Sequence, residues 1–154
     1  MPPKFSLQNV LDIRKSKVEG LEVELGKLIA AKQQMEELLT ALYENRTSLL
    51  EQLFLEQQGE MDLFNLSMLR ANIVATDERI QQVMKSLAEQ EIKVDKKRQE
   101  VVIAKQEEEM LVILKNKQHD VFMKEQAEKE AKQQDDIYIS QAFRQRQEES
   151  RYHG

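Results

Sequence analysis

Apolar residues in the first third of the chain recur at alternating steps of four and three. The repeat runs from Leu7 to Leu53, and 11 of its 14 positions are apolar. A period of 3.5 residues indicates a left-handed coiled coil, whereas a helix on a globular core follows a period of 3.6. The pattern predicts a helix from about residue 6 to residue 57, with Ser6 as its N-cap. The positions of this first seam, the stripe expected to face a partner helix, are Leu7, Leu11, Arg14, Val18, Leu21, Leu25, Leu28, Lys32, Met35, Leu39, Leu42, Arg46, Leu49 and Leu53.

The repeat breaks after residue 56, and the break predicts a reversal of the chain. Gly59 lies in the break and can adopt the left-handed conformation that often closes a helix. Asp62 is placed to cap the helix that follows. We therefore expect a turn at about residues 58–62.

A second and longer repeat follows the turn. Of its 18 seam positions 11 are apolar, and the seam weakens beyond Leu114. It predicts a helix from about residue 63 to residue 146, followed by a frayed tail. The positions of this second seam are Leu66, Leu69, Ile73, Thr76, Ile80, Val83, Leu87, Gln90, Val94, Lys97, Val101, Ala104, Glu108, Leu111, Lys115, Gln118, Phe122 and Glu125.

The two seams together predict an all-α fold. It is a long antiparallel two-helix coiled-coil hairpin, a single domain over residues 1–154, with the second helix extending past the first. In this arrangement Leu53 faces about Leu66, and Leu7 faces the region of Leu111, where the second seam fades. The alternative is one unbroken helix in a parallel dimer, against which Gly59 and the matched seam lengths argue. The chain is expected to be monomeric when free.

Composition and charge agree with a rod. Charged residues make up 33% of the chain and aromatic residues 5%, with four glycines and two prolines, as in long helices. The 23 basic and 28 acidic residues are interspersed, which argues against nucleic-acid binding. There is no cysteine, no apolar run long enough to cross a bilayer, and no apolar signal core at the N-terminus. We expect a cytoplasmic protein without membrane insertion.

Residues that could carry catalysis are sparse. His119 and His153 have no second histidine or cysteine at ligand spacing, so no metal site is predicted. Gly20 and Gly26 are the one closely spaced pair of glycines, and they are expected on the outer face of the first helix rather than in a phosphate-binding loop, so no cofactor is expected. These observations disfavour an enzyme and favour a protein that works by binding.

The aromatic residues cluster at the two ends of the predicted hairpin. Phe54 and Phe64 flank the turn, where we expect them to pack against each other and close the hairpin; an exposed binding tip is the alternative. Tyr138 and Phe143 lie beyond the end of the partner helix, so they are candidate contacts for another protein.

The opening residues resemble the N-terminal signature of the FliJ family, the small coiled-coil component of the bacterial flagellar export apparatus. The helix lengths and the turn containing glycine are also similar to that family's plan, and the resemblance covers essentially the whole chain. Asp136 stands where the family usually has glutamate. The matching residues are Phe5, Leu7, Val10, Leu11 and Arg14, then Lys93, Val94 and Asp95, then Asp135, Asp136, Phe143 and Arg144.

The resemblance implies a non-catalytic stalk or adaptor of type III export that binds the hexameric export ATPase and promotes its assembly. The export gate membrane protein and secretion chaperones are further candidate partners, and the protein would associate peripherally with the inner-membrane export apparatus. The residues implied at the ATPase end are Phe5, Leu7, Leu11, Arg14, Asp135, Asp136, Tyr138, Phe143 and Arg144.

The region implied to bind the gate departs from the family pattern. The start of the second helix carries Asn72, Thr76 and Arg79 where an apolar outer face is expected, and Val83 alone is apolar there. Phe54, Phe64 and Val83 are therefore the candidates for a contact on the tip or gate side. The alternative function is a generic coiled-coil scaffold, or a chaperone-like hairpin, that binds protein clients at its tip.

Overall fold

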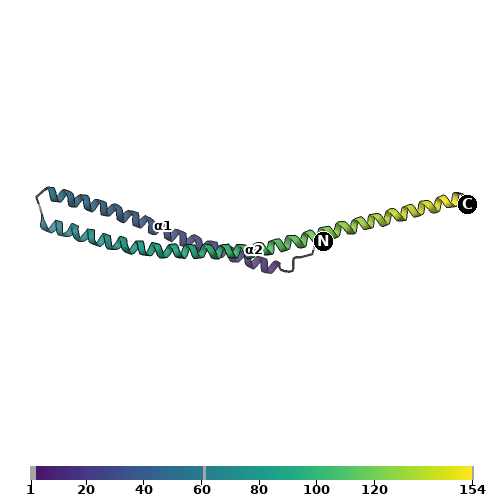
Figure 1. Cartoon of the computed structure of the whole chain (residues 1–154), viewed down its shortest axis with the longest axis horizontal. Coiled ribbons are helices and arrows are strands. Elements are labelled where there is room, and N and C mark those ends of the chain that lie inside the picture. Colours follow the sequence, from purple (N-terminus) through teal and green to yellow (C-terminus); the bar gives the residue numbers. More distant parts are fainter. Residues whose placement is uncertain (1–2, 61, 154) are drawn as a thin grey trace. The chain divides into compact units, whose positions relative to one another are not determined.

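The computed structural model describes residues 3–60 and 62–153 of the chain. Helix α1 spans Gln8–Gln58 and helix α2 spans Leu63–His153, with 51 and 91 residues (Figure 1). Met61, which falls in the predicted turn, lies outside the described residues. Helix α1 begins slightly later than predicted, and α2 continues beyond the predicted end near residue 146.

The first helix is capped one residue later than the sequence suggested. The N–H of Leu11 donates to the carbonyl of Leu7 over 2.9 Å, which places Leu7 at the N-cap. Ser6 lies in the preceding turn, where the N–H of Gln8 donates to the carbonyl of Phe5 over 3.0 Å. The predicted Ser6 cap is therefore wrong by one position. Ser6 belongs to the turn that begins at Phe5, and the helix begins after that turn.

Of the two features predicted for the reversal between the helices, the Asp62 cap is present and the left-handed Gly59 is not. The Asp62 carboxylate accepts the N–H groups of Phe64, over 3.0 Å, and of Asn65, over 3.4 Å, which confirms it as the cap of α2. No described glycine has a positive φ, so the expected left-handed conformation of Gly59 is wrong. Gly59 is exposed, so water can solvate the last carbonyls of α1 without such a cap.

The chain divides into two units. The tip unit is Lys15–Lys105, and the terminal unit combines Met1–Arg14 with Gln106–Gly154. In the tip unit α1 and α2 run side by side in opposite directions (Figure 1). In its cross-helix ion pairs the residue number on α2 increases as the residue number on α1 decreases, which confirms the antiparallel hairpin. They are Arg46–Asp77, Lys32–Glu91, Glu24–Lys97 and Glu22–Lys105.

The core of the tip unit follows the predicted seams. All of its buried residues are seam positions, so the heptad phase is confirmed. They are Val18, Leu66, Thr76, Ile80, Gln90, Val94, Val101 and Ala104. The charged seam residues Lys32, Arg46 and Lys97 are only partly buried. Their stems can pack in the seam while their charged ends reach acidic residues at its rim.

Two buried seam residues are polar, and each donates a hydrogen bond to a backbone carbonyl. The Gln90 amide crosses to the carbonyl of Leu28 on α1 over 3.0 Å, and the Thr76 hydroxyl reaches the carbonyl of Asn72 over 2.7 Å. No buried side-chain nitrogen or oxygen in the described residues lacks a partner. A polar seam residue commonly fixes the register of a coiled coil at some cost in stability.

The terminal unit has a small core of its own. Phe5 and Leu11 are buried with Leu111, and Val112 packs against them. The Arg14 guanidinium donates to the carbonyl of Glu107 over 2.8 Å. Beyond Phe122 the described side chains of α2 are exposed as far as residue 151, except for the partly buried Ala142. The second helix therefore extends past the first, as predicted.

Candidate partner-binding surfaces

The N-terminal candidates divide into core and rim. Phe5 and Leu11 are 9% and 1% exposed, so in the free chain their side chains are occupied in holding the two helices together. Arg14 is partly buried by its bond to α2, and Leu7 is exposed at the edge of the pair. Of these four residues, Leu7 and the exposed part of Arg14 are therefore the ones that a partner can contact directly.

The C-terminal candidates lie on the exposed helix, which we define as residues 123–151 of α2. Asp135, Asp136, Tyr138, Phe143 and Arg144 are all exposed there. The structure does not bring them together with Phe5, because Phe5 lies near Phe122. Tyr138 is about 24 Å further along α2 by the rise of 1.5 Å per residue.

Two further apolar residues accompany the predicted pair on the exposed helix. Ile137 and Ile139 flank Tyr138, and these three side chains, together with Phe143, are 59 to 73% exposed. With 3.6 residues per turn, residues 137, 138 and 139 point in three directions about 100° apart. With Phe143, these side chains cover about two thirds of the circumference of the helix, and Asp136, Ser140 and Arg144 occupy the remaining side. The apolar surface at this level is therefore wider than the single stripe of a helix that packs on one partner.

The rest of the exposed helix has a sequence that suits a helix in water. Glu125 precedes Lys129 by four residues, and Glu128 precedes Lys132 by the same interval. Pairs with glutamate on the N-terminal side stabilise an isolated helix by about 0.2 to 0.5 kcal/mol each. Local pairs of this kind help to support the helix without α1, and the apolar side chains of Ile137, Tyr138, Ile139 and Phe143 stay exposed.

The tip of the hairpin differs from its prediction. Phe54 and Phe64 are 60% and 71% exposed, so the expected mutual packing is wrong. The cause is heptad phase: Phe54 follows the seam residue Leu53, and Phe64 precedes Leu66 by two residues, which turns both rings outward. Val83 is a partly buried seam residue, which limits what it can offer to a partner.

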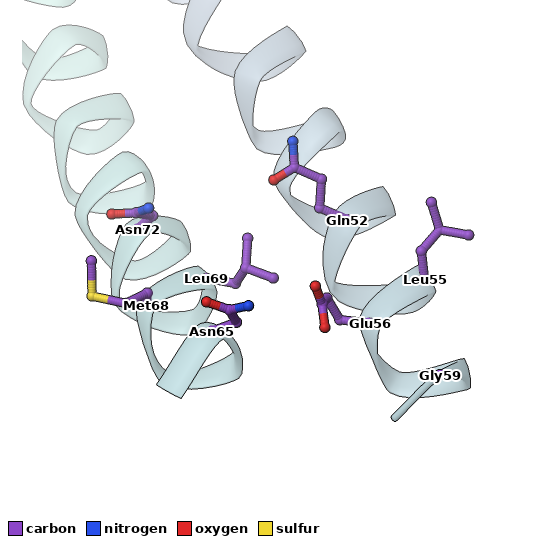
Figure 2. Close-up of a pocket in the computed structure, with 8 residues that line it drawn as sticks. All are labelled: Gln52, Leu55, Glu56, Gly59, Asn65, Met68, Leu69 and Asn72. Atoms are coloured by element: carbon purple, nitrogen blue, oxygen red, sulfur yellow. The ribbon is translucent and has the colours of Figure 1, made fainter. Parts of the chain in front are cut away.

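Four more apolar residues are exposed beside these two rings. They are Leu50, Leu55, Leu63 and Met68. A groove of about 640 Å³ separates the helix ends, with Leu55 and Met68 among its lining residues. Figure 2 shows Glu56 of α1 and Asn65 and Leu69 of α2 turned toward the space between the helices. Apolar residues out of phase with the seam were the signal in the sequence for this surface.

The tip of the hairpin and the apolar residues 137–143 both fall within one match to a known family. The model of the family described as flagellar FliJ protein matches residues 3–148. The chain belongs to the FliJ family. A search of curated proteins gives no match, and a search of solved structures gives none. Membership of the FliJ family makes the chain a component of flagellar type III protein export.

The charged residues of this FliJ family member form structural pairs along the helix rims. Lys97 donates to Glu100 over 2.8 Å and to Glu24 over 2.9 Å. These hydrogen bonds, Glu100 first, raise the pKa of Lys97, and the bond from Lys97 lowers the pKa of Glu100. The trio joins α1 to α2 within the tip unit, so its role is in pairing the helices.

Two further properties of the described chain bear on function. It contains no group of three histidine or acidic side chains close enough to hold a metal ion; the side chain of His153 lies outside the described residues. No helix in residues 3–60 and 62–153 is long and apolar enough to cross a membrane.

Proposed function

We propose that the chain is a non-catalytic stalk or adaptor that binds the hexameric ATPase of the flagellar export apparatus. It promotes assembly of the ATPase ring and couples the ring to export. In this role it is a cytoplasmic monomer without a cofactor, associated peripherally with the export apparatus at the inner membrane. Membership of the FliJ family supports a role in the flagellar export apparatus. The exposed helix supports a ring-shaped partner such as the ATPase.

The observation that carries this proposal is the apolar band that covers about two thirds of the circumference of the exposed helix. Ile137, Tyr138, Ile139 and Phe143 point to different sides, so a partner that touches one face would leave some of them in water. A ring with a central channel contacts the helix from all sides. Burial is worth about 1.5 to 3 kcal/mol for each large apolar side chain, so enclosing the band would be a strong driving force.

The other candidates at this end take supporting roles. Phe5 and Leu11 hold α1 against α2 and so position Leu7 and Arg14 at the edge of the paired helices. Asp135, Asp136 and Arg144 flank the apolar band with charges of both signs. We assign these charged residues to polar contacts with the channel wall, which would set the depth of insertion.

The test is the turnover rate and ring assembly of the export ATPase from the same organism, with and without the full chain. We expect stimulation by the wild type and loss of stimulation in the double variant Tyr138→Ala, Phe143→Ala. The matched control is Ile92→Ala, Val102→Ala, which removes two exposed apolar side chains from the tip unit. Circular dichroism checks that both variants keep their helices.

Two results would refute the ATPase assignment. One is equal stimulation by the wild type and the exposed-helix variant. The other is an ATPase that neither binds nor responds to the wild-type chain at concentrations well above those of the ring. Arg14→Ala is a useful third variant, because a loss of stimulation with an intact fold would place its guanidinium at the ATPase.

A second candidate function is a scaffold or chaperone-like hairpin that binds clients, the export gate or secretion chaperones at its tip. The exposure of Phe54 and Phe64 favours it. The variant Phe54→Ala, Phe64→Ala separates the two functions. It should leave ATPase stimulation intact if the chain is a stalk, and it should abolish client binding if the tip is the main site.

A further inference from the structure

The hairpin tip combines exposed apolar side chains with charge of one sign. Between Arg46 and Arg70 the sequence has no lysine, arginine or histidine, but it has Glu51, Glu56, Glu60 and Asp62. No other stretch of this length in the chain lacks a basic residue. We define the tip surface by its six exposed apolar residues, which are Leu50, Phe54, Leu55, Leu63, Phe64 and Met68.

The tip surface is grooved rather than flat. One groove, of about 640 Å³, lies between the helix ends, and a second, of about 430 Å³, lies on the last turns of α1. Leu55 lines both grooves, and Glu56 and Glu51 line one each. In Figure 2 Glu56 is turned toward the first groove, with Leu69 opposite. Apolar side chains with glutamates beside them are complementary to a helix with one apolar and one basic face.

We infer that the tip surface binds a basic amphipathic helix presented by a partner protein. Apolar residues of that helix at positions i, i+3, i+4 and i+7 contact Phe54, Leu55 and Met68, while its lysines and arginines meet Glu51 and Glu56. Methionine suits such a contact because its flexible side chain adapts to the shape of a partner. The inference does not rest on the ATPase proposal, because that proposal uses residues of the terminal unit.

The charge of the tip surface selects this occupant over two others. An anionic lipid surface would be repelled by four carboxylates that have no basic neighbour in the intervening sequence. A second copy of the chain would bring the same carboxylates against each other. A basic amphipathic helix can cover the apolar residues and also pair with the carboxylates.

The test uses a fluorescent 18-residue peptide of leucine and lysine, patterned as an amphipathic helix, titrated into the full chain. Two control peptides accompany it: one of the same composition in a scrambled order, and one with glutamate in place of lysine. Fluorescence anisotropy should show that the patterned lysine peptide binds at least tenfold more tightly than either control.

Protein variants locate the binding. Phe54→Ser with Phe64→Ser should weaken binding at least tenfold, whereas Val23→Ser with Ile92→Ser, equally exposed in the tip unit, should change it less than twofold. Glu51→Lys with Glu60→Lys should also abolish binding. The matched control Glu19→Lys with Glu37→Lys makes the same change in net charge away from the tip and should have little effect.

Several outcomes would overturn the inference. Equal losses in the tip and control charge variants would mean that the peptide responds only to net charge. A variant with serine at both phenylalanines that binds like wild type would remove the tip surface as the site. Sedimentation of the chain with anionic vesicles, or self-association abolished by the phenylalanine variant, would assign the surface to lipid or to a second copy.

Discussion

Replacing Gln90 by leucine should stabilise the hairpin. Gln90 lies at a seam position, is 6% exposed, and donates from its amide to the carbonyl of Leu28 across the helix pair. Its surroundings are those of a coiled-coil core, with Val94 one turn away and buried. The substitution exchanges a buried amide for an apolar side chain of similar size.

The magnitude follows from two opposing contributions. Losing the hydrogen bond costs about 0.5 to 1.5 kcal/mol. The Leu28 carbonyl is not left without a donor, because it lies inside α1, where the backbone N–H of Lys32 can donate to it. Burying a leucine side chain is worth about 1.5 to 3 kcal/mol, part of which the stem of glutamine already provides. We expect a net gain of about 1 kcal/mol in the free energy of unfolding.

Urea and thermal denaturation followed by circular dichroism at 222 nm measure this change. For a chain of this size 1 kcal/mol corresponds to a rise in Tm of about 2 to 4 °C. Gln90→Ala is the control, and it should lower stability because it removes the hydrogen bond without filling the space. A Gln90→Leu variant less stable than wild type would refute the reasoning, since it would make the cross-helix bond worth more than the apolar burial.

Three further predictions test other parts of the fold. Leu11→Ala should lower the free energy of unfolding by about 2 to 5 kcal/mol, as measured in urea, because it empties the core of the terminal unit. Gly20→Ala and Gly26→Ala should each raise it by about 0.5 to 1 kcal/mol, because an added Cβ meets no atom within 4 Å. Glu100, whose pKa is lowered by Lys97, contributes stability that is present above its ordinary pKa of 4.5 and lost as pH falls through the lower folded value. Glu100→Gln should therefore flatten the acid side of a plot of Tm against pH.

The fold was largely predictable because one physical rule dominates it. Two helices that pair along a seam must bury residues at a period of 3.5, so the phase of the apolar repeat indicates which side chains are inside. Ile80 and Val94 are buried as that phase requires, and even the polar Gln90 follows it. The helix ends were less predictable, since Ser6 and Gly59 depend on the local path of a few residues, which heptads do not specify.

The candidate surfaces were only partly predictable. Tyr138 and Phe143 were placed correctly outside the pair, because the first helix is too short to cover them. Ile139 was missed because the second seam was followed only to Glu125, although Ile139 continues its phase. Phe54 and Phe64 were expected to pack together because both flank the turn. That expectation overlooked that neither is a seam position, so both rings face outward.

Phase therefore separates the apolar residues that build this hairpin from those free to bind. An apolar residue in phase, with a partner helix alongside, is core, and Leu11 is the clearest case. An apolar residue out of phase or past the end of α1 contributes nothing to pairing and carries a risk of aggregation. Phe54 and Phe143 both meet this second condition, in different units of the molecule. Substitutions at Leu11 should therefore act on partners only through loss of structure, whereas substitutions at Phe54 and Phe143 should impair binding in a folded protein.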